Sequence, residues 1–262
     1  MKQKNILIRI EYDGNGFSGW QIQPDRRTVQ GTLEDVLSRV CGEEIHINGT
    51  SRTDAGVHAY GQCASFSGTF GIPTDRIPIA ANHLFPDIKI TSAEEKDSEF
   101  HARFSAVGKT YLYRISVSDT PDIFMRNYRY QLKDALDAGK MIEVAKALEG
   151  THDFSAFHSS GSNEPETAVR TIHRIDMIEY ADRDTKGMPT VEYEIRVTGD
   201  GFLYHMVRII VGTLTEAGVG EFSVEKAKEA LLSGKRACAG HTAPASGLWL
   251  EKIYFDEIEV SS

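Results

Sequence analysis

The feature that most restricts the fold of this chain is a two-residue alternation of apolar side chains, which returns several times along the sequence. Ile6, Ile8, Ile10 and Tyr12 form the first such run, and a similar run begins at Tyr111. Alternation with this period indicates a β-strand whose two faces are unequally buried. Segments with apolar residues at helical spacing lie between the alternating runs. This order predicts an α+β fold with an antiparallel or mixed sheet.

The ends of individual elements can also be placed. Thr28 and Ser223 are expected to be helix N-caps, and Asp13-Gly14-Asn15-Gly16 is expected to be a turn. The expected strands are 6–12, 62–66, 88–91, 111–117, 172–180, 191–197 and 248–255, and the expected helices are 29–40, 76–84, 141–148, 202–217 and 224–232. Because the order of elements begins again after about residue 105, we expect two similar α+β halves, 1–104 and 105–262.

Composition excludes several classes of protein. Of the 262 residues, 40% are hydrophobic and 26% are charged, which is typical of a folded globular chain and not of a disordered one. No apolar run reaches the roughly 20 residues that a membrane helix needs, and the N-terminus lacks the pattern of a signal peptide. Cys41, Cys63 and Cys238 are odd in number and form no CxxC motif. We therefore expect a reducing, cytoplasmic location and no disulfide scaffold.

The net charge bears on possible partners. A formal charge of −9 is the opposite of what a simple nucleic-acid binder shows, because the footprint of such a binder is usually basic. Net charge is a sum over the whole surface, however, and a local basic cleft can lie on an acidic body. The composition therefore disfavours nucleic-acid binding without excluding it.

The segment most indicative of chemistry is 49–58, which reads GTSRTDAGVH. It lies between an expected helix and an expected strand, so it is a loop, and loops on a rigid scaffold often carry functional side chains. Arg52 and Asp54 are two residues apart and would point to the same side of an extended loop. Such a pair could engage a ligand. The alternative is a local surface ion pair, with Gly56 closing a turn.

Two further residues are candidates. Arg208 lies within an apolar helical stretch, 206–211. A buried guanidinium needs a carboxylate or phosphate partner, unless the side chain extends past the apolar surface to solvent. Tyr111 has Lys109 and Arg114 as basic neighbours and could stack on a base, or it could be a tyrosine of the core.

The histidines do not predict a metal site. His152 with His158, and His58 with His101, match no ligand spacing that is typical of a metal centre. No metal is therefore expected.

Seven short segments of the sequence are informative when they are taken together. They are EYDG at 11–14 with GWQIQ at 19–23, SRTDAGVH at 51–58, FHARFSA at 100–106, KTYLY at 109–113, GTHDFSAF at 150–157, FLYHMVRIIVG at 202–212 and APASGL at 243–248. In this order, and over nearly the whole chain, they resemble the TruA family of tRNA pseudouridine synthases. The segment around Asp54 is specific by itself.

The resemblance implies an activity. The family isomerises uridine to pseudouridine in the anticodon stem-loop of tRNA, at tRNA positions 38, 39 and 40. By the matching motif positions, Asp54 is the catalytic aspartate and Arg52 enters the space left by the flipped base. Tyr111 stacks on the flipped uracil, and Arg208 pairs with the aspartate. Ser51 stands where relatives often have Gly, which affects loop flexibility rather than the chemistry.

The resemblance also implies a fold and partners. We expect two similar halves whose sheets join into one extended central sheet, with a cleft lined by basic residues. The catalytic loop belongs to 1–104, and Tyr111 and Arg208 belong to 105–262. The partners would be tRNA and a second copy of the chain in a homodimer. The reaction is redox-neutral, so no cofactor is expected. The candidate cations of the cleft are Arg26, Arg27, Arg52, Arg103, Lys109 and Arg114.

Two other readings remain open at this point. A non-catalytic RNA-binding or RNA-folding protein could use the same scaffold, although the intact motif around Asp54 argues against it. A carboxylate-dependent glycoside or nucleoside hydrolase would need a second acid near Asp54. After Asp54, the local sequence offers no acid before Asp75.

Overall fold

The computed structural model describes residues 3–161 and 166–258, and their contacts divide the chain into two compact units. The first unit contains residues up to 107 together with 249–258, and the second contains 108–248. The halves expected from the sequence, 1–104 and 105–262, differ from these units mainly at 249–258. These residues group with the first unit because Trp249 and Leu250 pair with His58 and Ala59 of an N-terminal strand.

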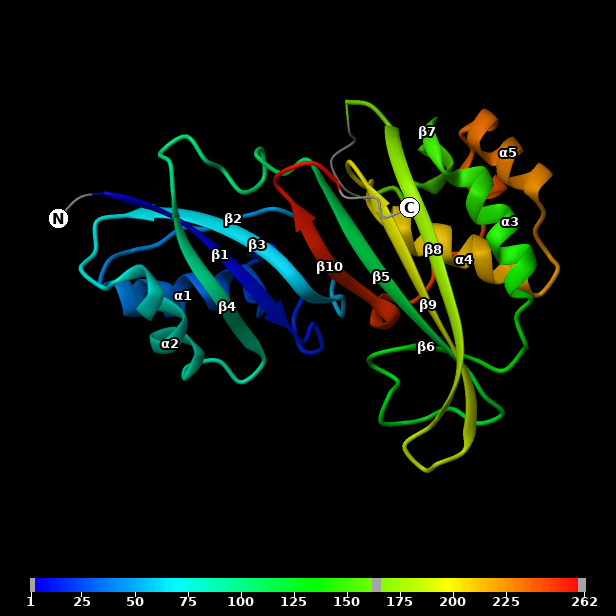
Figure 1. The fold of residues 1–262 in the computed structure, drawn as a ribbon, viewed down its shortest axis with the longest axis horizontal. Coiled ribbons are helices and arrows are strands. Elements are labelled where there is room, and N and C mark those ends of the chain that lie inside the picture. The colour runs from blue at the N-terminus through cyan, green and yellow to red at the C-terminus, as the bar shows by residue number, and fades with distance from the viewer. Residues whose placement is uncertain (1–2, 162–165, 259–262) are drawn as a thin grey trace. The chain divides into compact units, whose positions relative to one another are not determined.

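The first unit is built on a mixed sheet (Figure 1). Its strands are β1 (Lys4–Tyr12), β2 (Asn48–Gly49), β3 (His58–Gly68), β4 (Ile88–Lys96) and β10 (Leu248–Tyr254). The order is β4-β1-β3-β10, with β2 paired to β3. β1 is antiparallel to both β3 and β4, whereas β10 runs parallel to β3.

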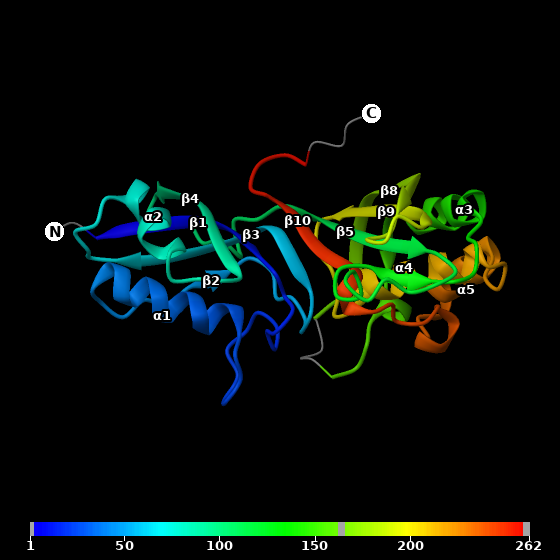
Figure 2. The same ribbon diagram turned by 90° about the horizontal axis from the view of Figure 1, so that it is seen from below.

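Helix α1 (Val29–Cys41) packs on one face of this sheet (Figure 2). The Thr28 hydroxyl accepts a hydrogen bond from the Gly31 N–H and so caps the helix, as expected from the sequence. Val29, Leu33, Val36 and Leu37 form its buried stripe. The unit also has a short helix α2 (Ile77–Asn82), which follows the 3₁₀ turn Thr74–Arg76.

The second unit has an antiparallel sheet in the order β5-β9-β8-β7, with the short strand β6 parallel to β5. The strands are β5 (Gly108–Val117), β6 (Tyr130–Leu132), β7 (Gly150–Asp153), β8 (Val169–Arg183) and β9 (Pro189–Gly199). The helices are α3 (Ala138–Leu148), α4 (Met206–Gly218) and α5 (Val224–Ser233), and 3₁₀ turns cover Ser155–Phe157, Arg236–Cys238 and Ala245–Gly247. Helix α3 packs against both α4 and α5.

The α+β class expected from the alternating runs is confirmed, and both units mix strands with helices. Two boundaries differ for clear reasons. The helix expected from Phe202 begins only at Met206, because His205 adopts a left-handed conformation with φ of 63°. The helix expected over 76–84 is α2, which is shorter at both ends, follows the 3₁₀ turn and has Pro78 in its first turn, where proline is tolerated.

Within the part of the chain that the structure describes, no helix is long and apolar enough to cross a membrane.

Candidate functional site

The Asp54 loop connects β2 to β3, which pair antiparallel, in the first unit. Ser51 and Thr53 are buried, Arg52 is exposed and Asp54 is half-buried. This alternation is typical of an extended segment that anchors every second residue. Arg52, Asp54 and Ala55 are thus accessible to solvent, and Arg52 and Asp54 are the two of these with charged side chains.

Thr53 is the main anchor of the Asp54 loop. Its hydroxyl lies 2.7 Å from the hydroxyl of Tyr12 at the end of β1, in a buried contact. Its carbonyl accepts a hydrogen bond from the Trp20 N–H at 3.0 Å. The residue directly before Asp54 is therefore held on both its side chain and its backbone. Tyr12 and Trp20 belong to the EYDG and GWQIQ segments, so these motifs have a structural role.

Two glycines of the same N-terminal segments let the Asp54 loop approach closely. A Cβ atom on Gly14 would lie 2.0 Å from the carbonyl oxygen of Val57, where no side chain fits. Gly19 has a φ of 90°, and a Cβ atom there would lie 2.8 Å from the carbonyl oxygen of Thr53. Both positions require glycine, one for space and the other for conformation as well.

His58 fixes the C-terminal end of the loop. Its ring is completely buried, and its Nδ1 accepts a hydrogen bond from the Gly14 N–H at 3.0 Å. The same Nδ1 lies 3.1 Å from a carboxylate oxygen of Asp13. The His58 ring also stacks on Trp249, with the ring centres 4.2 Å apart. The Asp54 loop is thus tied to the last residue of β1 through Thr53 and to the turn after β1 through His58.

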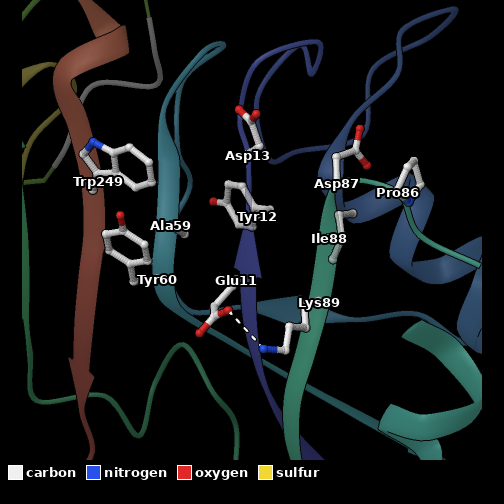
Figure 3. A pocket seen from close by; sticks show the side chains of 10 residues that line it. All are labelled: Glu11, Tyr12, Asp13, Ala59, Tyr60, Pro86, Asp87, Ile88, Lys89 and Trp249. Atoms are coloured by element: carbon white, nitrogen blue, oxygen red, sulfur yellow. Dashed lines mark ion pairs between the residues drawn. The ribbon is translucent and has the colours of Figure 1, made fainter. Parts of the chain in front are cut away.

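A shallow hollow of about 260 Å³ opens beside the end of β1 (Figure 3). Its lining includes Tyr60, which stacks on Trp249, and the carboxylates of Glu11, Asp13 and Asp87. Lys89 pairs with Glu11 at 3.8 Å. Neither Arg52 nor Asp54 is among the residues that line this hollow. The hollow is therefore separate from the site that the sequence predicts.

Tyr111 and Arg208 both belong to the second unit. Tyr111 lies on β5, is 6% exposed and meets the ring of Phe202 edge-on, with the ring centres 5.3 Å apart. Tyr113 lies two residues after Tyr111 on the same strand, and its hydroxyl donates to the carbonyl oxygen of Pro244 at 2.7 Å. Burial raises the pKa of Tyr113 well above its ordinary value, which keeps that hydroxyl protonated as a donor.

Arg208 is half-buried in the first turn of α4, a helix that is otherwise buried almost throughout. Its Nε donates to the carbonyl oxygen of Ala243 at 2.7 Å, and the Ala243 N–H donates back to the carbonyl of Arg208 at 3.1 Å. The backbone of the APASGL segment thus fixes the guanidinium. The pairing of Arg208 with Asp54 stays a prediction.

The structure therefore groups the predicted residues by unit, with Arg52 and Asp54 in the first and Tyr111 and Arg208 in the second. In the second unit, three of the motifs converge through Phe202, Arg208 and Pro244. Among residues 3–161 and 166–258, no group of three or more His, Cys, Asp or Glu side chains is arranged to hold a metal ion.

Comparison with known proteins gives consistent matches. A family model described as tRNA pseudouridine synthase matches residues 8–105 and 144–256. The tRNA pseudouridine synthase A of Acetivibrio thermocellus is 45% identical over 253 residues, which are 96% of this chain and 100% of the relative. The enzyme of the same name from Bacillus subtilis is 44% identical over 254 residues, 96% of this chain and 99% of the relative. A Clostridium tetani protein, tRNA pseudouridine synthase A 2, is 43% identical over 256 residues, with 97% and 99% covered.

Proposed function

This chain belongs to the TruA family of tRNA pseudouridine synthases, and on that premise we propose the substrate and the roles of its residues. The substrate is the anticodon stem-loop of tRNA, where uridines at tRNA positions 38, 39 and 40 are converted to pseudouridine. Asp54 is the catalytic carboxylate. The observation that carries this proposal is the anchored loop, whose accessible charged side chains are Arg52 and Asp54.

The reaction breaks the N1–C1′ glycosidic bond, turns the uracil and joins its C5 to C1′; C5 then loses its proton and N1 gains one, so the reaction is an isomerisation. Asp54 acts in the first step as an ionised carboxylate, either as a nucleophile at the sugar or as a base at C2′. A half-buried carboxylate on an anchored loop suits both roles, since it is accessible and its position is fixed. A cationic partner would favour the ionised form, and we assign that role to Arg208.

The target base must leave the helical stack before it reacts, which costs a few kcal/mol. We assign Arg52 to the space that the base leaves, because its side chain is exposed beside Asp54. Tyr111 is the platform on which the extruded uracil stacks. Its edge-on contact with Phe202 supports this role, because that contact fixes the tilt of the Tyr111 ring.

The same proposal includes the partners. The chain acts on tRNA as a homodimer in the cytoplasm, with one subunit holding the tRNA while the other performs the chemistry. The match of the chain to full-length relatives supports the use of the same substrate.

The proposal is tested with an unmodified tRNA transcript that carries uridines at the three positions. The purified protein should convert at least one of them, as mapped by chemical labelling and primer extension. Release of free uracil would indicate a hydrolase instead, and tight binding without modification would indicate a non-catalytic RNA-binding protein. Each of these two results contradicts the proposal.

A further inference from the structure

Gln62 is a completely buried residue of β3 whose side chain completes the hydrogen bonding of the Ser51 backbone. Its Nε2 donates to the carbonyl oxygen of Ser51 at 2.7 Å. Its Oε1 accepts from the N–H groups of Ser51, at 3.4 Å, and of Cys63, at 3.1 Å. Because the two N–H groups both need an acceptor, only one orientation of the amide fits.

This contact lies where regular strand pairing stops. β2 pairs with β3 as far as Gly49 and Ala64, and the Thr50 N–H still donates to the Cys63 carbonyl at 2.8 Å. At Ser51 the chain turns away, and the Gln62 side chain replaces the missing strand neighbour. Buried backbone groups without partners are strongly disfavoured, so the amide holds the chain at this point.

The residue held in this way comes directly before Arg52. The carbonyl of Ser51 and the N–H of Arg52 belong to one planar peptide unit, so fixing one fixes the other. Thr53, on the other side of Arg52, is held by Tyr12 and Trp20. Arg52 is thus an exposed side chain between two buried anchors.

We propose that Gln62 is a positioning residue for base extrusion, because it sets the direction in which Arg52 leaves the loop. This inference rests on the proposed function, in which Arg52 enters the space that the target uridine leaves. The contact uses only the backbone of Ser51, so a Gly at that position would preserve it.

The test compares Gln62→Met with the wild type in single-turnover reactions on two tRNA transcripts. In one transcript the target uridine is paired in the anticodon stem. In the other, the opposite base is changed so that the pair cannot form, which lowers the cost of extrusion. The variant should be slowed about ten- to hundredfold on the paired uridine. On the unpaired uridine it should react within about threefold of the wild type.

A matched control comes from Gln131 in the second unit, whose amide also spans both backbone groups of one residue. It accepts from the Asp122 N–H at 2.6 Å and donates to the Asp122 carbonyl at 2.7 Å. Gln131→Met should leave the ratio of the two rates unchanged. If thermal unfolding shows that Gln62→Met does not fold, Gln62→Asn replaces it in the test. Its shorter amide reaches Ser51 less well, so we expect a smaller loss of rate on the paired uridine than for Gln62→Met.

Arg52→Ala separates a failure of this inference from a failure of the proposed function. If Arg52→Ala is slow on both transcripts, the proposed role of Arg52 in extrusion is wrong. If Arg52→Ala recovers on the unpaired uridine and the Gln62 variants do not, Gln62 does not position Arg52. Equal slowing of the Gln62 variants on both transcripts likewise overturns the inference.

Discussion

At the scale of single residues, the Asp54 loop depends on polar contacts that water does not reach. Tyr12 is 4% exposed, and its hydroxyl lies 2.7 Å from the Thr53 hydroxyl. When one of two paired buried hydroxyls is removed, the other is left without a hydrogen bond. This lowers stability more than replacing both hydroxyls by apolar groups of the same shape would. The position of Asp54 therefore depends on a contact made by the residue directly before it.

Tyr12→Phe removes this contact with little change in packing. We expect a loss of about 1–3 kcal/mol in the free energy of unfolding. We also expect a rate of pseudouridine formation that is about ten- to hundredfold lower, because Asp54 loses its fixed position. Urea unfolding and single-turnover kinetics measure the two effects.

The control for Tyr12→Phe is Tyr193→Phe, which removes a buried hydroxyl that donates to the Leu136 carbonyl at 3.1 Å in the second unit. Tyr193→Phe should lower stability by a similar amount and leave the rate at saturating tRNA unchanged. If both variants slow the reaction equally, the Tyr12 contact has no special relation to Asp54.

At the scale of elements, α4 is the helix most closely enclosed by other parts of the second unit. A Cβ atom on Gly212 would lie 1.9 Å from the carbonyl oxygen of His241, in the segment that leads to Ala243. A Cβ atom on Gly240 would lie 2.6 Å from the Cα atom of Thr213 on the same helix. This close packing brings Arg208 within reach of the Ala243 carbonyl.

Gly212→Ala should therefore separate α4 from the 240–244 segment. We expect destabilisation of about 1–3 kcal/mol from overpacking, although Ala is normally the better helix former. Gly139→Ala in the exposed first turn of α3 is the matched change, and it should be nearly neutral, because its Cβ atom would lie 3.2 Å from the Asp137 side-chain oxygen, which can shift. Thermal unfolding of both variants measures these changes in stability. A Gly212→Ala protein as stable as the wild type would contradict the close packing.

Asp122 connects two loops of the second unit. Its carboxylate accepts from the N–H groups of Phe124 at 2.9 Å and Thr185 at 2.8 Å. The Thr185 hydrogen bond is the main reason that the pKa of Asp122 falls from 3.8 to about 2. Because the folded pKa is the lower one, this carboxylate stabilises the fold above the unfolded pKa, and the contribution is lost as the pH falls through the folded pKa.

We therefore expect the stability difference between the wild type and Asp122→Asn to shrink as the pH falls from about 5 to about 2. Protection of the Thr185 amide, measured as its hydrogen-exchange rate relative to the intrinsic rate at each pH, should fall in the wild type over the same interval and be low in the variant throughout. A difference in urea midpoint that does not change with pH would contradict this assignment.

The elements that sequence patterns predict well are those whose patterns are local. The alternation before Tyr12 and the Thr28 cap depend on neighbouring residues, and both are confirmed. Strands β2, β6 and β7 have two to four residues and no detectable period. The late start of α4 depends on the backbone conformation of His205, which no periodicity signals.

The same limit applies to the site. The motif identifies Arg52 and Asp54, but the contacts that anchor them join residues distant in sequence. Tyr12 and Thr53 are 41 positions apart, and Gln62 and Ser51 are 11 apart. The one local signal for Gln62 is a polar residue in the middle of a buried strand, and such a residue must find a partner.

At the scale of the whole molecule, a chain with a net charge of −9 needs a locally basic surface to bind RNA. Some candidate cations are already engaged by carboxylates. Arg27 forms two hydrogen bonds with Asp87, at 2.7 and 2.9 Å, and Arg114 pairs with Glu194 at 3.1 Å. These pairs leave fewer cations for phosphate, which favours exposed residues such as Arg26 as phosphate contacts.

Binding of tRNA should weaken steeply with salt, because each phosphate contact releases counterions. Arg26→Gln should reduce the slope of log K against log salt by about 1, whereas Arg27→Gln should leave it nearly unchanged. Binding isotherms between low and moderate salt measure these slopes. A salt-independent affinity would exclude a basic binding surface, and a larger effect of Arg27→Gln would reverse the assignment.

The central claim is that Asp54 performs the isomerisation on a tRNA that the rest of the protein binds. Asp54→Asn keeps the size of the side chain and removes the ionised oxygen. The direct measurement maps pseudouridine in unmodified tRNA after incubation with wild type and Asp54→Asn, with tRNA affinity measured for both. We expect pseudouridine with the wild type, none with Asp54→Asn, and similar affinities of the two proteins for tRNA. Pseudouridine formed by an uncontaminated Asp54→Asn preparation would contradict it.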